Sequence, residues 1–154
     1  MIRIGIVGTG GMGQVHYNNY AHIDGCEVVA LVGVTEQSRE CAERWGLPLY
    51  ADIPSMAQAE ELDVVDVCSP TYLHKQHVIE SLNAGLHAIT EKPVALHRKD
   101  AQEMFDLAAE KGRLLLVGQV LQFTREVEVL RSLVQSGEYG KPLDAFFERL
   151  SACP

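Results

Sequence analysis

A glycine-rich turn between a short apolar segment and a helix-like stretch constrains the fold more than any other feature of this sequence. Gly8, Gly10 and Gly13 follow the apolar residues 2–7 with the spacing G-x-G-x-x-G. In this context the first glycine allows a sharp turn off a strand, the second allows backbone to approach a pyrophosphate, and the third allows a helix to pack closely on the strand. The pattern predicts a phosphate-binding turn at a helix N-terminus, with a tight turn that binds no ligand as the alternative. The other members of this turn are Thr9, Gly11 and Met12.

Short apolar runs alternate with helix-like stretches along the rest of the chain, as expected for parallel strands joined by helical crossovers. Strands are predicted at residues 2–7, 27–32, 47–50, 64–68, 87–90 and 114–117. Helices are predicted at residues 13–23, 36–45, 73–83 and 99–110. Several strands are apolar throughout, which is typical of a sheet covered on both faces. The predicted fold class is α/β, a Rossmann-type doubly wound parallel sheet with helices on both faces.

The composition excludes several classes of partner. The chain has 154 residues, 47% of them hydrophobic, and a net charge of −8. An acidic surface repels phosphate backbones and anionic lipids, and no apolar run approaches the ~20 residues that span a bilayer, so neither nucleic acid nor membrane is expected. The cysteines form no Cys-x-x-Cys pair, which indicates reduced thiols in a cytoplasmic protein. They are Cys26, Cys41, Cys68 and Cys153.

Four further motifs follow the glycine turn in order. They are CSPTYLH at residues 68–74, EKP at 91–93, VGQVLQF at 117–123 and GEYGKP at 137–142. With these motifs the chain resembles the N-terminal half of the glucose–fructose oxidoreductase/inositol dehydrogenase/rhizopine catabolism family. The resemblance implies hydride transfer between NAD or NADP and a sugar, polyol or similar small alcohol or ketone. It also implies an NAD(P)-binding domain at residues 1–120.

Lys92 is the catalytic residue that the resemblance implies, next to the substrate. A lysine after a parallel strand lies in the crevice where such sheets bind ligands, and its ammonium can polarise a carbonyl or hold an alkoxide. Glu91 is expected to orient the site, and Pro93 to stiffen the turn through a cis peptide bond of the kind the family shows. For an isolated tripeptide, a charged loop is the alternative.

The resemblance places Ser69, Pro70 and Thr71 beside the cofactor, mainly through their backbone, with a plain strand-to-helix turn as the alternative. His74 belongs to the same motif. His74 and His77 share a helix face, but no third ligand stands nearby, so no metal site is expected.

Gln119 is expected to reach the nicotinamide or the substrate, whereas a surface role is at least as good a reading for Gln122. Both stand where the family often has histidine, asparagine or arginine.

The second strand departs from the usual NAD pattern. An acidic residue normally ends this strand and binds the ribose hydroxyls, but Gly33 stands there. Thr35, Ser38 and Arg39 can supply donors to a 2′-phosphate, which favours NADP, whereas Glu36 swinging back to a ribose would favour NAD.

Two functions from different classes remain open. The first is the cofactor-binding half of an oxidoreductase for a sugar or polyol, and a homo-oligomer is compatible with it. Residues 121–154 are then expected to form a closing helix and the start of a connection to a second α/β substrate domain, so that this chain alone turns over no substrate. The second is a non-catalytic dinucleotide sensor. A methyltransferase using S-adenosylmethionine explains only the glycine turn.

Overall fold

A parallel sheet of six strands organises the first 118 residues of the computed structural model, which describes residues 1–148 and 150. Its strands are β1 (Ile2–Val7), β2 (Cys26–Val32), β3 (Leu49–Tyr50), β4 (Val64–Val67), β5 (His87–Thr90) and β6 (Leu115–Val117). Every neighbouring pair is parallel, and the order is β3-β2-β1-β4-β5-β6. This is the strand order of a doubly wound Rossmann sheet, so the predicted fold class is confirmed.

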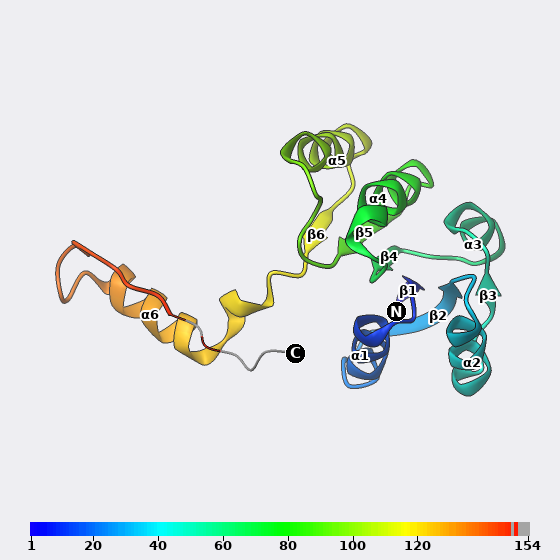
Figure 1. The fold of residues 1–154 in the computed structure, drawn as a ribbon, viewed down its shortest axis with the longest axis horizontal. Coiled ribbons are helices and arrows are strands. Elements are labelled where there is room, and N and C mark those ends of the chain that lie inside the picture. Colours follow the sequence, from blue (N-terminus) through cyan, green and yellow to red (C-terminus); the bar gives the residue numbers. More distant parts are fainter. Residues whose placement is uncertain (149, 151–154) are drawn as a thin grey trace. The chain divides into compact units, whose positions relative to one another are not determined.

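Helices cover both faces of this sheet (Figure 1). α1 (Gly11–Tyr20) and α2 (Glu36–Trp45) lie on one face. The other face carries α3 (Ile53–Ala59), α4 (His74–Asn83) and α5 (Arg98–Lys111). The near-continuous apolar strands therefore have the cause expected from the sequence, since each of their faces is buried.

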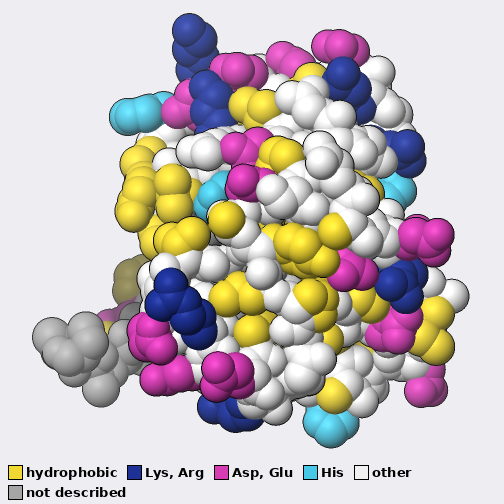
Figure 2. Space-filling view, turned by 90° about the vertical axis from the view of Figure 1, so that its right-hand side faces the viewer, with side chains coloured by type: hydrophobic (Ala, Val, Ile, Leu, Met, Phe, Trp, Pro, Cys, Tyr) yellow, Lys and Arg dark blue, Asp and Glu magenta, His cyan; other side chains and the backbone are white. Residues whose placement is uncertain are grey.

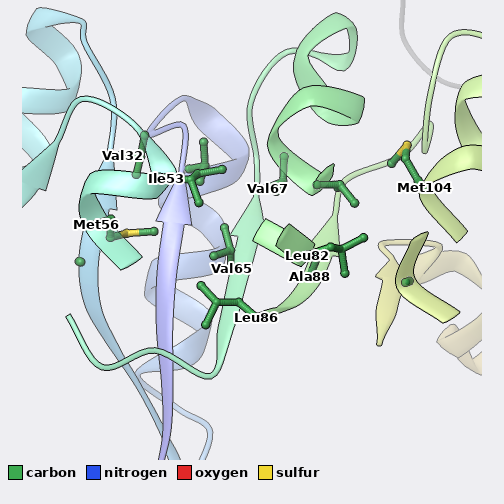
Figure 3. Packing of buried hydrophobic residues seen from close by; sticks show 13 residues of the cluster. Val32, Ile53, Met56, Val65, Val67, Leu82, Leu86, Ala88 and Met104 are labelled. Carbon is green, nitrogen blue, oxygen red and sulfur yellow. The ribbon is translucent and has the colours of Figure 1, made fainter. Parts of the chain in front are cut away.

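Alternation along the strands divides the core into two clusters. Ile4, Ile6 and Leu31 pack with residues of α1 and α2. Successive residues of a strand point to opposite faces of the sheet. Val65 and Val67 of β4 therefore pack against the helices of the second face. Figure 3 shows this second cluster. Its side chains from α3, α4 and α5 include Ile53, Met56, Leu82 and Met104.

The helix α3 was not predicted. The side chain of Asp52 caps it by accepting a hydrogen bond of 2.8 Å from the Ser55 N–H, and Pro54 stands in its first turn. Asp as N-cap followed by Pro is a recognised start signal. With seven residues, however, α3 is too short to show a helical period of its own.

Residues from 119 onward form a second unit. It contains the 3-10 helix η2 (Val120–Phe123) and the helix α6 (Arg125–Ser136). Residues 143–150, part of the predicted connection, form no strand in the described residues 143–148 and 150. Phe146 and Phe147 are 87% and 78% exposed there, since no described strand pairs with this segment. Residues 149 and 151–154 lie outside the described residues.

No helix in the described part of the chain is long and apolar enough to cross a membrane. Three of the cysteines, Cys26, Cys41 and Cys68, are free thiols, and Cys153 lies outside the described residues. On the face shown in Figure 2, lysine and arginine side chains of the described residues lie among aspartate and glutamate side chains. This face therefore offers no continuous basic surface among those residues.

Candidate functional site

The carboxyl ends of β1, β4 and β5 lie at one edge of the sheet. Val7 is paired with Val67, and Val67 in turn with Thr90. The ladder continues one residue beyond β4 and β5, since the Cys68 N–H donates to the Val7 carbonyl at 2.8 Å and the Glu91 N–H to the Val67 carbonyl at 3.0 Å. The turns that follow these strands therefore meet at this edge, where open α/β sheets bind their ligands.

The glycine turn after β1 has the geometry that its spacing predicts. Gly8 adopts φ +90°, and a Cβ there would lie 2.9 Å from the Ser69 backbone. A Cβ on Gly13 would collide with the Gly8 carbonyl oxygen. Both glycines are therefore required by the protein's own packing.

Gly10 and Gly11 differ from their neighbours in the turn, because a Cβ on either would meet no atom within 4 Å. Gly10 is also the N-cap of α1 and makes no side-chain cap hydrogen bond. The first N–H groups of α1 therefore face open space that a phosphate can fill, and the turn fits the pyrophosphate of a dinucleotide.

A cavity of about 550 Å³ opens along this edge. It brings together most of the residues predicted to bind the cofactor, namely residues 8–12, Gly33, Thr35, Ser69 and Pro70. Such a volume is in the range of small-molecule sites. The cavity also contains residues that the sequence analysis missed, namely Val34, Gln37, Ala51, Leu73 and His77. Val34 is the second residue after β2 and Ala51 directly follows β3, so the rule that ligands bind at strand ends could have found them.

Several predicted residues do not line this cavity. Gly13 packs against Gly8, and Arg39 is an exposed partner of Glu36 at 2.7 Å. Thr71 begins the 3-10 helix η1 (Thr71–Leu73) before α4. Gln119 belongs to the second unit, so its role remains a prediction.

His74 is buried and connects two loops through its imidazole. Its Nδ1 lies 2.9 Å from the Pro93 carbonyl oxygen and its Nε2 lies 2.9 Å from the Ser69 carbonyl oxygen. The neighbouring His77 has its Nδ1 2.9 Å from the Ser69 hydroxyl. Burial lowers the pKa of His77 below its usual value. Both imidazoles thus contact Ser69, His74 at its carbonyl oxygen and His77 at its hydroxyl.

Ser38 connects the glycine turn to the start of α2. Its hydroxyl accepts a hydrogen bond from Thr9 Oγ1 at 3.0 Å and lies 2.9 Å from Thr35 Oγ1. Thr35 also caps α2 by accepting from the Ser38 N–H at 3.2 Å. A Cβ on Gly33 would collide with the Ser38 hydroxyl, so glycine at position 33 has a packing cause as well as an electrostatic consequence.

The Glu91-Lys92-Pro93 turn follows β5 at the same edge of the sheet. The Lys92–Pro93 peptide bond is cis, as the resemblance implies. The Lys92 N–H donates to Glu91 Oε2 at 3.1 Å. The Lys92 side chain is exposed, and it forms no ion pair within the described residues. Glu91 and Lys92 are not among the residues that line the cavity.

A polar cluster beneath this turn was also missed by the sequence analysis. It consists of His16, Tyr20, Asp66, Cys68 and Glu91. Donor atoms of His16, Asp66 and Cys68 lie within 4.8 Å of one another, a spacing that a metal ion could bridge. These atoms are instead hydrogen-bonded to each other, and no buried side-chain nitrogen or oxygen of the described residues lacks a partner.

Known proteins share this fold and these motifs. The family model described as oxidoreductase family, NAD-binding Rossmann fold, matches residues 2–119. D-glucoside 3-dehydrogenase of Escherichia coli (strain K12) is 33% identical over 143 residues, which cover 91% of this chain and 41% of that relative.

Two solved structures resemble the chain over most of its length. The WlbA dehydrogenase from Bordetella pertussis, in complex with NADH and UDP-GlcNAcA, has a TM-score of 0.86 at 26% identity, over 90% of this chain and 43% of that one. Biliverdin reductase from Synechocystis sp. PCC 6803, in complex with biliverdin and NADP+, has a TM-score of 0.77 at 26% identity, over 87% of this chain and 43% of that one.

The chain thus spans about two fifths of the length of these relatives. The family match covers more than half of the chain. The matched residues contain the glycine turn, the strands β1 to β6 and the turn after β5. The chain belongs to the glucose–fructose oxidoreductase/inositol dehydrogenase/rhizopine catabolism family of oxidoreductases, of which it contains the NAD-binding Rossmann domain.

Proposed function

We propose that this chain is the cofactor-binding half of an NAD(P)-dependent oxidoreductase that acts on the CH–OH group of a sugar, polyol or similar small alcohol or ketone. The observation that carries the proposal is the open, uncapped start of α1 at Gly10 and Gly11. Two positions without a side chain at a helix N-terminus let the backbone reach a pyrophosphate that any side chain would displace.

The end of β2 supports a preference for NADP over NAD. Gly33 supplies no carboxylate to the ribose, and Thr35, Gln37 and Ser38 line this part of the cavity with neutral polar groups. Glu36, the acid that could bind a ribose instead, is held by Arg39 at 2.7 Å. This ion pair is exposed, so it restrains Glu36 only weakly. We therefore keep NAD as the alternative cofactor.

Lys92 is the residue proposed to act on the substrate. Its ammonium can donate a hydrogen bond to the substrate oxygen and stabilise negative charge as the C–H bond breaks or forms. A bound nicotinamide ring would supply the two-electron chemistry itself. Glu91 holds the Lys92 backbone through the bond to its N–H, so that the ammonium leaves the sheet from a defined position.

The substrate class rests on relatives that act on sugars. D-glucoside 3-dehydrogenase and the UDP-GlcNAcA complex of WlbA are named for such compounds. The proposal extends this class to the present protein, whose substrate pocket would be completed outside residues 1–118. Three free thiols fit a reducing, cytoplasmic setting.

A dinucleotide sensor without catalysis is the second candidate. Its support is the position of Lys92, which does not line the cavity of the glycine turn. A sensor would bind the dinucleotide equally well but would not depend on Lys92 for its output.

Calorimetric titration with NADPH, NADH and S-adenosylmethionine tests the proposal. We expect both nicotinamide dinucleotides to bind in the micromolar range, NADPH more tightly, and S-adenosylmethionine not to bind. Binding of S-adenosylmethionine alone would overturn the proposal, and tighter binding of NADH would overturn the cofactor preference.

A further inference from the structure

Asp66 is a carboxylate in the interior of a core strand. The residues on either side of it, Val65 and Val67, face α3 and α4, so the alternation of β4 turns Asp66 toward α1. Its side chain is completely buried. A buried carboxylate requires several donors. Here Tyr20 donates its hydroxyl at 2.8 Å to Oδ2, and the Cys68 thiol donates to Oδ1 at 3.6 Å.

His16 bridges this buried carboxylate to a second one. Its Nδ1 lies 2.7 Å from Asp66 Oδ2, and its Nε2 lies 3.2 Å from Glu91 Oε1. A neutral imidazole carries a single N–H and would turn a lone pair toward one of the two carboxylates. Both contacts are hydrogen bonds only in the imidazolium. In agreement, the hydrogen bond to Asp66, aided by the negative charges of Asp66 and Glu91, raises the pKa of His16 despite its partial burial.

Glu91 transmits this contact to the turn that carries Lys92. Its side chain is 8% exposed, with Oε1 at His16 and Oε2 accepting from the Lys92 N–H at 3.1 Å. A Cβ on Gly118, which directly follows β6, would lie only 3.1 Å from Oε1, so glycine at this position leaves room for the carboxylate. Both oxygens of Glu91 are therefore fixed.

We propose that His16 is a positioning residue, which as an imidazolium between Asp66 and Glu91 fixes the turn from which the Lys92 side chain leaves the sheet. The value of this position for catalysis rests on the function proposed above for Lys92. The relay itself runs from Asp66 through His16 and Glu91 to the Lys92 N–H, and it can be tested without substrate or cofactor.

Titration of this chain by NMR reads the relay directly. The groups that face His16 are Tyr20 on α1, Asp66 on β4, and Cys68 and Glu91 after the strands β4 and β5. Burial raises the pKa of both Tyr20 and Cys68, so neither loses its proton near neutral pH. We expect the His16 imidazole to titrate above the usual value near 6.5, and the Lys92 amide proton to shift with the same midpoint. A Lys92 amide that does not follow His16 would overturn the proposal.

Two conservative variants separate positioning from general packing. The Asn side chain places its amide near Nδ1 of histidine, and the Gln side chain places it near Nε2. His16→Gln therefore keeps the donor for Glu91, whereas His16→Asn keeps only the donor for Asp66. We expect hydrogen exchange of the Lys92 amide to accelerate about fivefold or more in His16→Asn, as for the loss of one charge-assisted hydrogen bond, and to stay near the parent rate in His16→Gln.

Equal effects of both variants would reduce His16 to a packing role and overturn the proposal. Should either variant fail to fold, Glu91→Gln gives the same readout from the other side, since it should uncouple the Lys92 amide from the His16 titration. NADPH binding, measured in parallel, distinguishes the two proposals. If NADPH binds but the Lys92 amide does not follow His16, only the role of His16 is contradicted. If the Lys92 amide follows His16 but NADPH does not bind, only the proposed function is contradicted.

Discussion

The side chain of Ser38 occupies the space that a Cβ on Gly33 would need. Its hydroxyl would collide with a Cβ on Gly33, and the same hydroxyl is held by Thr9 and Thr35. The lack of a ribose-binding acid at the end of β2 and the hydroxyl network of Ser38 are therefore linked. A change of cofactor preference at position 33 requires a change at position 38.

The first prediction concerns this pair. Gly33→Asp alone is expected to destabilise the fold by about 1–3 kcal/mol, as for an overpacked site, and to weaken binding of NADPH and NADH alike. Gly33→Asp combined with Ser38→Gly should restore stability and turn the preference toward NADH, because the carboxylate repels a 2′-phosphate. Urea unfolding and calorimetry measure both effects, with Ser38→Gly alone as control. A fully stable single variant would contradict the steric argument.

The second prediction separates two glycines of the same turn. Gly10→Val should leave the free energy of unfolding nearly unchanged, because its Cβ meets open space and its φ of −65° suits any residue. It should nevertheless lower dinucleotide affinity by at least tenfold, because the side chain occupies the place of the pyrophosphate. Gly13→Ala is the matched comparison, with an expected destabilisation of about 1–3 kcal/mol from its collision with Gly8. Undiminished binding in Gly10→Val would show that the phosphates lie elsewhere.

Much of the fold was predictable because its signals are local. Apolar runs marked the strands, and the helix predicted at residues 36–45 is found as α2 (Glu36–Trp45), where Thr35 and Gly46 provide both caps. The start of α1 was predicted two residues late, since glycines are poor helix formers and here serve as its first turn.

The polar cluster had no such signal. His16 and Asp66 are separated by 50 residues and His16 and Glu91 by 75, so nothing in the spacing of the sequence links them. Asp66 was included in an apolar run and treated as strand interior. A charged residue inside a strand buried on both faces does predict buried donors opposite it. It cannot say which residue supplies them, because that depends on how α1 packs on the sheet.

The third prediction concerns Lys92 in the intact enzyme. Lys92→Ala is expected to lower kcat by about 10²-fold while dinucleotide affinity stays within a few-fold, because an acid/base or electrostatic group is lost and the cavity is unchanged. Lys92→Arg keeps the charge but not the compact ammonium, so it serves as the control for charge alone. Unchanged kcat in Lys92→Ala would favour the sensor.

The last prediction follows from two histidines whose pKa values move in opposite directions. Partial burial lowers the pKa of His77, so the folded state resists its protonation, and stability is expected to fall as the pH drops below the unfolded value near 6.5. The hydrogen bond to Asp66 raises the pKa of His16, so its contribution to stability is fully present below that unfolded value and is lost as the pH rises through the folded pKa.

Urea unfolding between pH 5 and 9 should therefore show two separable effects. His77→Asn should reduce the loss of stability on the acid side, because no group remains there to be protonated. His16→Gln should differ most from the parent at acid pH and approach it as the pH rises, because the parent then loses its imidazolium. A stability difference between His16→Gln and the parent that stays constant across this range would mean that His16 has the same pKa in the folded and the unfolded protein. It would contradict a stabilising imidazolium between Asp66 and Glu91.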